Sequence, residues 1–216
     1  MDPVLQGAFA TGYERLAAWA DLLDEINVYP VADADTGRNL MISLAPLHRM
    51  DASAETTVRK LLVSATGNSG NIASGFFAGF VAENPSKDIY QATRVGRDRA
   101  WQAIADPKPG TMLTVFDELL SHLENLSSDL LAATFPTLID QLEKAVHSTS
   151  ETLPALRAAG VVDSGALGMF IFMEGFFSRL AGRPDVFRPS PRSSIRNCDC
   201  LPISWRITQK DIASMR

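Results

Sequence analysis

A short acidic turn between two apolar helical patterns carries the side chains best suited to chemistry. It reads Asn27-Val-Tyr-Pro-Val-Ala-Asp33-Ala-Asp35-Thr36-Gly37-Arg-Asn39-Leu40. Asp33 and Asp35 stand two residues apart on a backbone that Pro30 stiffens. Mg²⁺ usually takes one or two protein carboxylates together with phosphate oxygens and water. The turn therefore favours a metal-bound phosphate site, although Asp35 or Thr36 could instead serve only as the cap of the next helix.

Three further joints between expected helices combine glycine with hydroxyl, amide or carboxylate side chains. They are Gly67-Asn68-Ser69-Gly70-Asn71, Gly110-Thr111-Met112-Leu113-Thr114 and Val162-Asp163-Ser164-Gly165. Glycine lets a ligand approach the backbone closely, and the first N–H groups of a helix attract anions. Each joint alone is more simply explained as an ordinary turn or helix cap. The recurrence of such side chains at all four joints is what favours a phosphate site.

Apolar residues recur at intervals of three and four along most of the chain, which is the period of an amphipathic helix. This pattern predicts helices near residues 4–26, 39–48, 54–65, 70–82, 86–105, 113–125, 130–150 and 165–180. Alternating strand patterns are scarce, so the sequence predicts an all-α fold of about eight helices.

The charge and the proline content change near residue 182. Residues 1–182 carry 13 Lys or Arg against 22 Asp or Glu, a net charge of −9, whereas residues 183–216 carry 7 against 3, a net charge of +4. Prolines also interrupt the second segment. We expect a helical domain over residues 1–182, followed by a Pro-rich basic tail or the start of a further domain.

The composition excludes several classes of protein. A net charge of −5 argues against a nucleic-acid-binding protein, which would concentrate basic residues on one surface. No stretch of about 18 apolar residues predicts a membrane span, and the first residues do not form a signal peptide, so a cytoplasmic location is expected. Cys198 and Cys200 are interpreted as free thiols in a reducing compartment.

In content and order, the four joints together resemble one known family. This family is the nucleotide-binding domain of the dihydroxyacetone kinase L type (DhaL or DAK2), and the chain is most similar to its branch formed by the N-terminal domain of the bacterial fatty acid kinase A subunit. The resemblance spans about residues 5–180. It rests on the acidic turn, on Gly67-Asn68-Ser69-Gly70, on Gly110-Thr111-Met112-Leu113-Thr114-Val115 and on Gly160-Val161-Val162-Asp163-Ser164-Gly165.

The resemblance implies an antiparallel barrel of eight α-helices, with ATP or ADP and two Mg²⁺ ions at one mouth. It implies Asp33 and Asp35 as the catalytic metal ligands, with Asn27 near the position of a third ligand. The nucleotide contacts that it implies are Thr36, Asn39, Gly67, Asn68, Ser69 and Gly70 around the phosphates, Thr111, Met112 and Leu113 near the ribose and base, and Asp163 and Gly165 at the closing wall.

The same resemblance implies a kinase that transfers the γ-phosphoryl group of ATP to a fatty acid carboxylate. A DegV-like fatty-acid-binding protein, separate or fused, would present this acceptor, and Asn27 in place of Asp points to the fatty-acid branch. Two other hypotheses stay open, namely a dihydroxyacetone-type kinase subunit and a non-catalytic module that retains ADP and docks onto a partner. A homodimer is also left open.

One residue departs from the family pattern. The family usually has glycine between the two carboxylates, where this chain has Ala34. If the turn needs a positive φ there, we expect a strain of about 1 kcal/mol or more and weaker metal binding.

Overall fold

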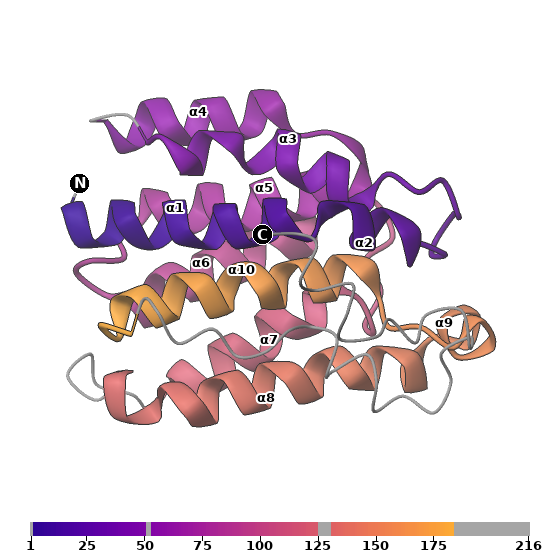
Figure 1. The fold of residues 1–216 in the computed structure, drawn as a ribbon. Coiled ribbons are helices and arrows are strands. Elements are labelled where there is room, and N and C mark those ends of the chain that lie inside the picture. Colours follow the sequence, from indigo (N-terminus) through magenta and orange to yellow (C-terminus); the bar gives the residue numbers. More distant parts are fainter. Residues whose placement is uncertain (1, 51–52, 125–130, 184–216) are drawn as a thin grey trace, which may run out of the picture.

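A computed structural model describes residues 2–50, 53–124 and 131–183 of the chain (Figure 1). Within these ranges the chain forms ten α-helices and no strand, so the all-α prediction is confirmed. The helices are α1 (Pro3–Ala18), α2 (Ala20–Glu25), α3 (Thr36–His48), α4 (Ala54–Ser64), α5 (Gly67–Ala82), α6 (Ile89–Gln102), α7 (Met112–Leu123), α8 (Leu131–Thr152), α9 (Pro154–Ala159) and α10 (Ser164–Leu180). Except for Arg183, the segment expected as a basic tail lies outside the described residues.

Two local features raise the helix number above the expected eight. The long first helix divides at Trp19, whose φ of −119° and ψ of 7° interrupt the helical backbone between α1 and α2. The short helix α9 was not expected. Pro154 starts it, because the first helical position needs no N–H donor, and Gly160 ends it in the left-handed conformation with φ +67°.

Neighbouring helices pack in a closed circuit that runs from α1 through α3, α5, α6, α7, α8 and α10 back to α1. The small helices α2 and α9 pack against α3 and α8, respectively, and α4 packs against α3 and α5. Helix α10 also contacts α7, and its residues from Ser164 to Ser178 are all buried. It is therefore the central helix of the domain, and the closed circuit agrees with the barrel that the resemblance implied.

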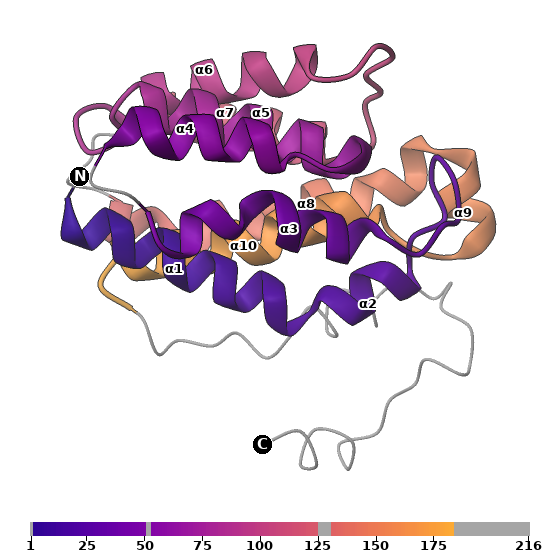
Figure 2. The same ribbon diagram turned by 90° about the horizontal axis from the view of Figure 1, so that it is seen from above.

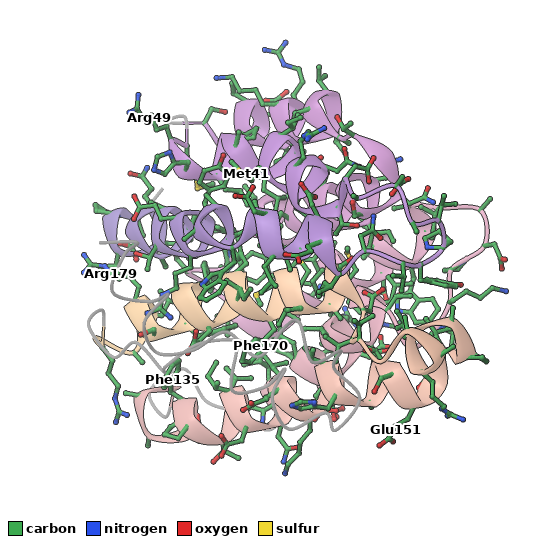
Figure 3. The ribbon with its side chains drawn as sticks, turned by 45° about the vertical axis from the view of Figure 1, so that its right-hand side comes forward. Met41, Arg49, Phe135, Glu151, Phe170 and Arg179 are labelled. Atoms are coloured by element: carbon green, nitrogen blue, oxygen red, sulfur yellow. The ribbon has the colours of Figure 1, made fainter. Side chains whose placement is uncertain are left out.

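Aromatic side chains fill much of the space between the helices. The ring of Phe9 on α1 lies 6.1 Å from that of Phe77 on α5 and 4.9 Å from that of Phe176 on α10. Phe76 of α5 stacks on Phe116 of α7 at 4.0 Å. Figure 3 shows the side chains on this scaffold, with exposed ones such as Arg49 extending away from it. This packing fixes the helix ends relative to one another.

Helices α3, α5, α7 and α10 all begin at the same end of the domain, on the right in Figure 1, because α4, α6 and α8 run in the opposite direction between them. The loops that lead into these four helices are the polar joints found in the sequence. A helix N-terminus carries unpaired N–H groups and the positive end of the helix dipole. The fold therefore gathers four such ends in one region.

Candidate functional site

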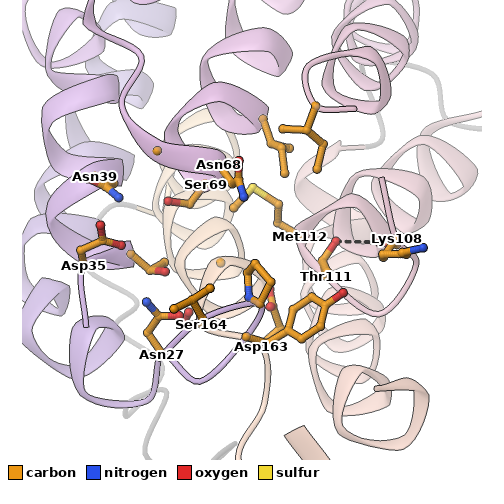
Figure 4. A pocket seen from close by; sticks show the side chains of 18 of the residues that line it. Asn27, Asp35, Asn39, Asn68, Ser69, Lys108, Thr111, Met112, Asp163 and Ser164 are labelled. Carbon is orange, nitrogen blue, oxygen red and sulfur yellow. Dashed lines mark hydrogen bonds between the residues drawn. The ribbon is translucent and has the colours of Figure 1, made fainter. Parts of the chain in front are cut away.

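A pocket of about 440 Å³ lies at this end of the domain, between the starts of α3, α5, α7 and α10 (Figure 4). Of the residues that the sequence singled out, Gly70 and Leu113 do not line it. Those that do are Asn27, Asp33, Asp35, Thr36, Asn39, Gly67, Asn68, Ser69, Thr111, Met112, Asp163 and Gly165. A pocket of this size accommodates a small-molecule ligand.

Asp24, rather than Asp35, caps helix α3. The carboxylate oxygen Oδ1 of Asp24 accepts hydrogen bonds from the backbone N–H of Gly37 at 2.6 Å and of Arg38 at 3.2 Å. Asp35 occupies the position before the helix, but its side chain makes no capping hydrogen bond. The interpretation of Asp35 as no more than a cap is therefore wrong, and its carboxylate is left for another partner in the pocket.

A hydrogen bond from Asn27 holds the side chain of Asp33 in the acidic turn. Its amide nitrogen Nδ2 donates to Asp33 Oδ1 at 2.7 Å, while the residue itself is 5% exposed. The amide oxygen Oδ1 of Asn27 is buried and has no hydrogen-bond partner among the described residues. A buried acceptor without a donor is costly unless a ligand, a cation or water satisfies it.

Ala34 adopts a φ of +52°, in the left-handed region that favours glycine. The turn thus has the positive φ at Ala34 for which the sequence analysis predicted strain. The neighbouring carboxylates of Asp33 and Asp35 are held on either side of this strained residue. The conformation costs about 1 kcal/mol or more for a residue with a Cβ.

The start of α5 presents uncapped backbone N–H groups to the pocket. Thr66 precedes the helix without a side-chain capping bond, and its hydroxyl donates instead to the carbonyl of Ser64 at 3.0 Å. Gly67 has φ +65°, and a Cβ at this residue would collide with the amide of Asn39. The glycine therefore allows α5 to begin directly beside α3.

The two predicted residues that do not line the pocket serve packing instead. Gly70 faces α3, where a Cβ would collide with the hydroxyl of Ser43. Leu113 is fully buried in the core below the start of α7. Both lie one turn or less from pocket residues, so the sequence motif identified the joint but not which face of the helix points inward.

Asp163 joins the starts of α7 and α10. Its carboxylate accepts a hydrogen bond from the N–H of Ala166 at 2.7 Å, and the backbone N–H groups of Met112 and Gly165 also bind it. Burial raises the pKa of Asp163 from 3.8 to about 7, and the three hydrogen bonds oppose this rise. Asp163 therefore fixes the two helix starts against each other at the wall of the pocket.

Lys108 is a rim residue that the sequence reasoning missed. It is the one basic side chain among the described residues that line the pocket, and its Nζ lies 2.8 Å from the carboxylate of Asp106. The hydroxyl of Thr111 donates to the carbonyl of Lys108 at 2.9 Å, which holds this loop against the start of α7 (Figure 4). A lysine within a Pro-Lys-Pro-Gly run was the available signal.

The candidate metal ligands form a small set. The described residues contain no cluster of three or more His, Cys, Asp or Glu side chains that could hold a metal ion. Asp33 and Asp35 supply two carboxylates, and Asn27 adds a buried amide oxygen beside them. Two carboxylates are compatible with Mg²⁺ where phosphate oxygens and water complete the coordination, but not with a cage made by the protein alone.

An all-α domain with a polar pocket between gathered helix N-termini defines a class of small-molecule-binding helical domains. Residues 30–178 match the DAK2 domain family, and the chain belongs to that family. The family is part of the dihydroxyacetone kinases, which are kinase-related proteins that bind ADP or ATP. The matched range contains all the polar joints except the residues before Pro30.

Two relatives extend this finding. The chain is 32% identical over 199 residues to an uncharacterized protein of Staphylococcus haemolyticus, covering 84% of this chain and 35% of the relative. It is also 32% identical over 189 residues to the protein YloV of Bacillus subtilis, covering 79% and 34%, respectively. The chain thus spans about a third of the length of these curated relatives. None of the described helices has the length and apolar character needed to cross a membrane.

Proposed function

We propose that this chain is the Mg²⁺- and ATP-binding domain of a kinase whose acceptor is a fatty acid carboxylate. One observation carries the proposal. The carboxylates of Asp33 and Asp35, which do not cap helix α3, line the same pocket as the uncapped start of α5. Anionic phosphates need donors and a positive field, and the divalent ion that accompanies them needs carboxylates.

The residues at the start of α5 bind the phosphates in this proposal. The N–H groups of Asn68 and Ser69 lie in the first turn, where the helix dipole favours an anion. Thr36 at the start of α3 lines the same pocket, and the amide of Asn39 lies directly beside Gly67. These groups orient the terminal phosphate, and positioning of this kind supplies most of the catalysis in phosphoryl transfer.

Asp33 and Asp35 would hold Mg²⁺, with Asn27 Oδ1 as a neighbouring acceptor. An ion held by these residues would neutralise charge on the phosphates of ATP. Met112, Ile72 and Ile104 are among the apolar residues of the pocket lining, which suit the ribose and base. Asp163 and Gly165 close the wall beside Met112, where a Cβ on Gly165 would meet the Met112 side chain.

In the proposed reaction, a carboxylate oxygen of the fatty acid forms a bond to the γ-phosphorus of ATP. The bond between this phosphorus and the oxygen that bridges to the β-phosphate breaks, and ADP leaves with the electron pair. The product is an acyl phosphate. Asn27, in place of an acidic residue, supports the fatty-acid branch, and a DegV-like protein would present the acyl chain.

Calorimetric titration of ATP, with and without Mg²⁺, tests the nucleotide site. Asp35→Asn should lower the affinity for Mg²⁺-ATP by at least about tenfold, or about 1.4 kcal/mol, because it removes a metal ligand. Asp21→Asn, the same change at an exposed residue of α2 outside the pocket, should leave the affinity unchanged. Binding that is independent of Mg²⁺ and equal in both variants would contradict the metal assignment.

Detection of the acyl phosphate tests the acceptor. The chain, Mg²⁺-ATP and a DegV-like protein loaded with a fatty acid should release ADP and form acyl phosphate, which hydroxylamine traps as a hydroxamate. Asp35→Asn should abolish the trapped product. Phosphate transfer to dihydroxyacetone instead would favour the ketose kinase, whereas tight retention of ADP without any transfer would favour a non-catalytic module.

A further inference from the structure

The outer face of α3 and α4 carries a second hollow, distinct from the pocket at the helix starts. It is a groove of about 560 Å³ lined by Ile42, Ala45, Pro46, Arg59, Lys60, Val63 and Ser64. None of these residues lines the nucleotide pocket. Helices α3 and α4, whose residues line this groove, pack against each other, and Figure 2 shows their ribbons side by side.

The apolar side chains that line this α3–α4 groove are exposed at its edges. Val63 is 82% exposed and Ile42 is 47% exposed, and Leu62 beside them is 55% exposed. Three of the five large hydrophobic side chains that are exposed in the described structure thus lie on these two helices. Clustered apolar exposure of this kind marks an interaction surface more often than scattered single residues do.

Cations stand beside these apolar side chains. Arg59 and Lys60 line the groove directly, and Arg59 makes no ion pair with any residue that the structure describes. Arg38, Ile42 and Ala45 of α3 are all exposed and follow the three- and four-residue spacing of one helix face, and the exposed Arg49 follows directly after the helix. Glu55 is the single acidic residue in α3 and α4. This face is therefore basic, in a segment of the chain, residues 1–182, that has a net charge of −9.

We propose that the α3–α4 groove is a docking site for an acidic amphipathic helix of a partner polypeptide. The cations attract carboxylates, and the apolar lining of the groove accepts side chains spaced at three and four residues along a helix. A third helix laid along two neighbouring helices packs its ridges into the groove between them. The basic segment 183–216 of this same chain has the wrong charge to be this helix.

The shape of the site distinguishes this partner from a lipid surface. A concave groove between two helices receives inserted side chains, whereas an anionic bilayer contacts a protruding apolar face. The charges alone would suit either partner. The concavity therefore favours the helix, and the experiment includes vesicles as the competing outcome.

Fluorescence anisotropy with designed peptides tests the proposal on the full 216-residue chain. The probe is a labelled helical peptide of about 18 residues, with leucine at spacings of three and four and glutamate elsewhere; the control peptide has lysine in place of each glutamate. The chain should bind the acidic peptide at least about tenfold more tightly than the basic one, and added salt should weaken this binding.

Matched variants locate the binding to the groove. Val63→Glu and Arg59→Glu should each lower the affinity for the acidic peptide by about tenfold. Val4→Glu, the same change at another exposed valine, on α1, should leave the affinity unchanged. Because Val63 and Arg59 are exposed, circular dichroism should show unchanged helix content, and ATP binding should be retained in all three variants.

Three results would overturn the proposal. They are an absence of peptide binding, equal binding of the acidic and basic peptides, and loss of affinity that is the same in Val4→Glu as in Val63→Glu. Co-sedimentation with phosphatidylglycerol vesicles that is lost in Arg59→Glu, without peptide binding, would assign the groove to a membrane surface instead.

Discussion

At the residue scale, Ala34 lies between Asp33 and Asp35, the two residues that we propose as metal ligands. Its φ of +52° places a methyl group in a conformation that costs about 1 kcal/mol or more, between two carboxylates that must keep their spacing. Asn27 holds one side of the turn through Asp33, and Asp24 holds the other through Gly37. The surrounding hydrogen bonds therefore stabilise a turn that its central residue disfavours.

Ala34→Gly should raise the free energy of unfolding by about 0.5–1 kcal/mol, because glycine adopts the left-handed conformation without a steric penalty. The gain is partly offset by the greater freedom of glycine in the unfolded chain. Urea unfolding measures the change. Ala32→Gly, in the same turn but with a negative φ, should show no gain; equal effects of the two changes would contradict a strained Ala34.

At the scale of the helix, α3 depends on a cap from outside its own sequence. Asp24 lies in the last turn of α2. Its carboxylate accepts hydrogen bonds from the N–H groups of Gly37 and Arg38, thirteen and fourteen residues further along the chain. Local patterns point to Asp35 or Thr36 as the cap, because a cap is normally the residue just before the helix. Only the packing of α2 against α3 brings Asp24 to this position.

Asp24→Ala should lower the free energy of unfolding by about 1 kcal/mol, the usual cost of losing a helix cap. It should also weaken Mg²⁺-ATP binding in the proposed function, because Asp35 and Thr36 would lose their fixed position. Urea unfolding and calorimetry measure the two effects. Asp21→Ala, at an exposed residue of the same helix, is the control, and an equal loss in both variants would contradict a capping role for Asp24.

Periodicity alone predicted the large helices, and the breaks between them were less visible. The interruption at Trp19 has no glycine or proline to mark it, and the six-residue α9 is too short to show a helical period. The helical period also continued correctly across two prolines, since Pro46 lies within α3 and Pro136 within α8. Tertiary packing overrides local preference at such positions.

At the scale of the whole molecule, the alternating direction of the helices brings four joints that are distant in the sequence to one end of the domain. The joints could be recognised in the sequence because glycine and polar residues stand between apolar stretches. The sequence could not show which side of each helix faces the pocket. Gly70 and Leu113 were therefore assigned to the ligand, although Gly70 faces α3 and Leu113 lies in the core. Asp24 was missed because its role depends on a contact between α2 and α3, whereas Lys108 was missed although its partner Asp106 lies only two residues away.

Asp163 makes the stability of the fold depend on pH, because its buried carboxyl group joins the starts of α10 and α7. Its pKa is about 7 in the folded protein and 3.8 in the unfolded chain. Between these values the folded state binds the proton that the unfolded state releases, so this group makes the free energy of unfolding fall as pH rises from about 4 to about 7. Above that range its contribution stays constant and unfavourable.

Comparison of the wild-type protein with Asp163→Asn, by urea unfolding at pH 5 and at pH 8, isolates this effect from all other titrations. The amide cannot ionise, and its loss of hydrogen bonds to α7 and α10 is the same at both pH values. The stability of the wild type relative to the variant should therefore be greater at pH 5 than at pH 8, by about 1 kcal/mol or more. A relative stability that is equal at the two pH values, or greater at pH 8, would mean that the carboxylate stays charged in the folded protein, held by the N–H groups of Ala166, Met112 and Gly165.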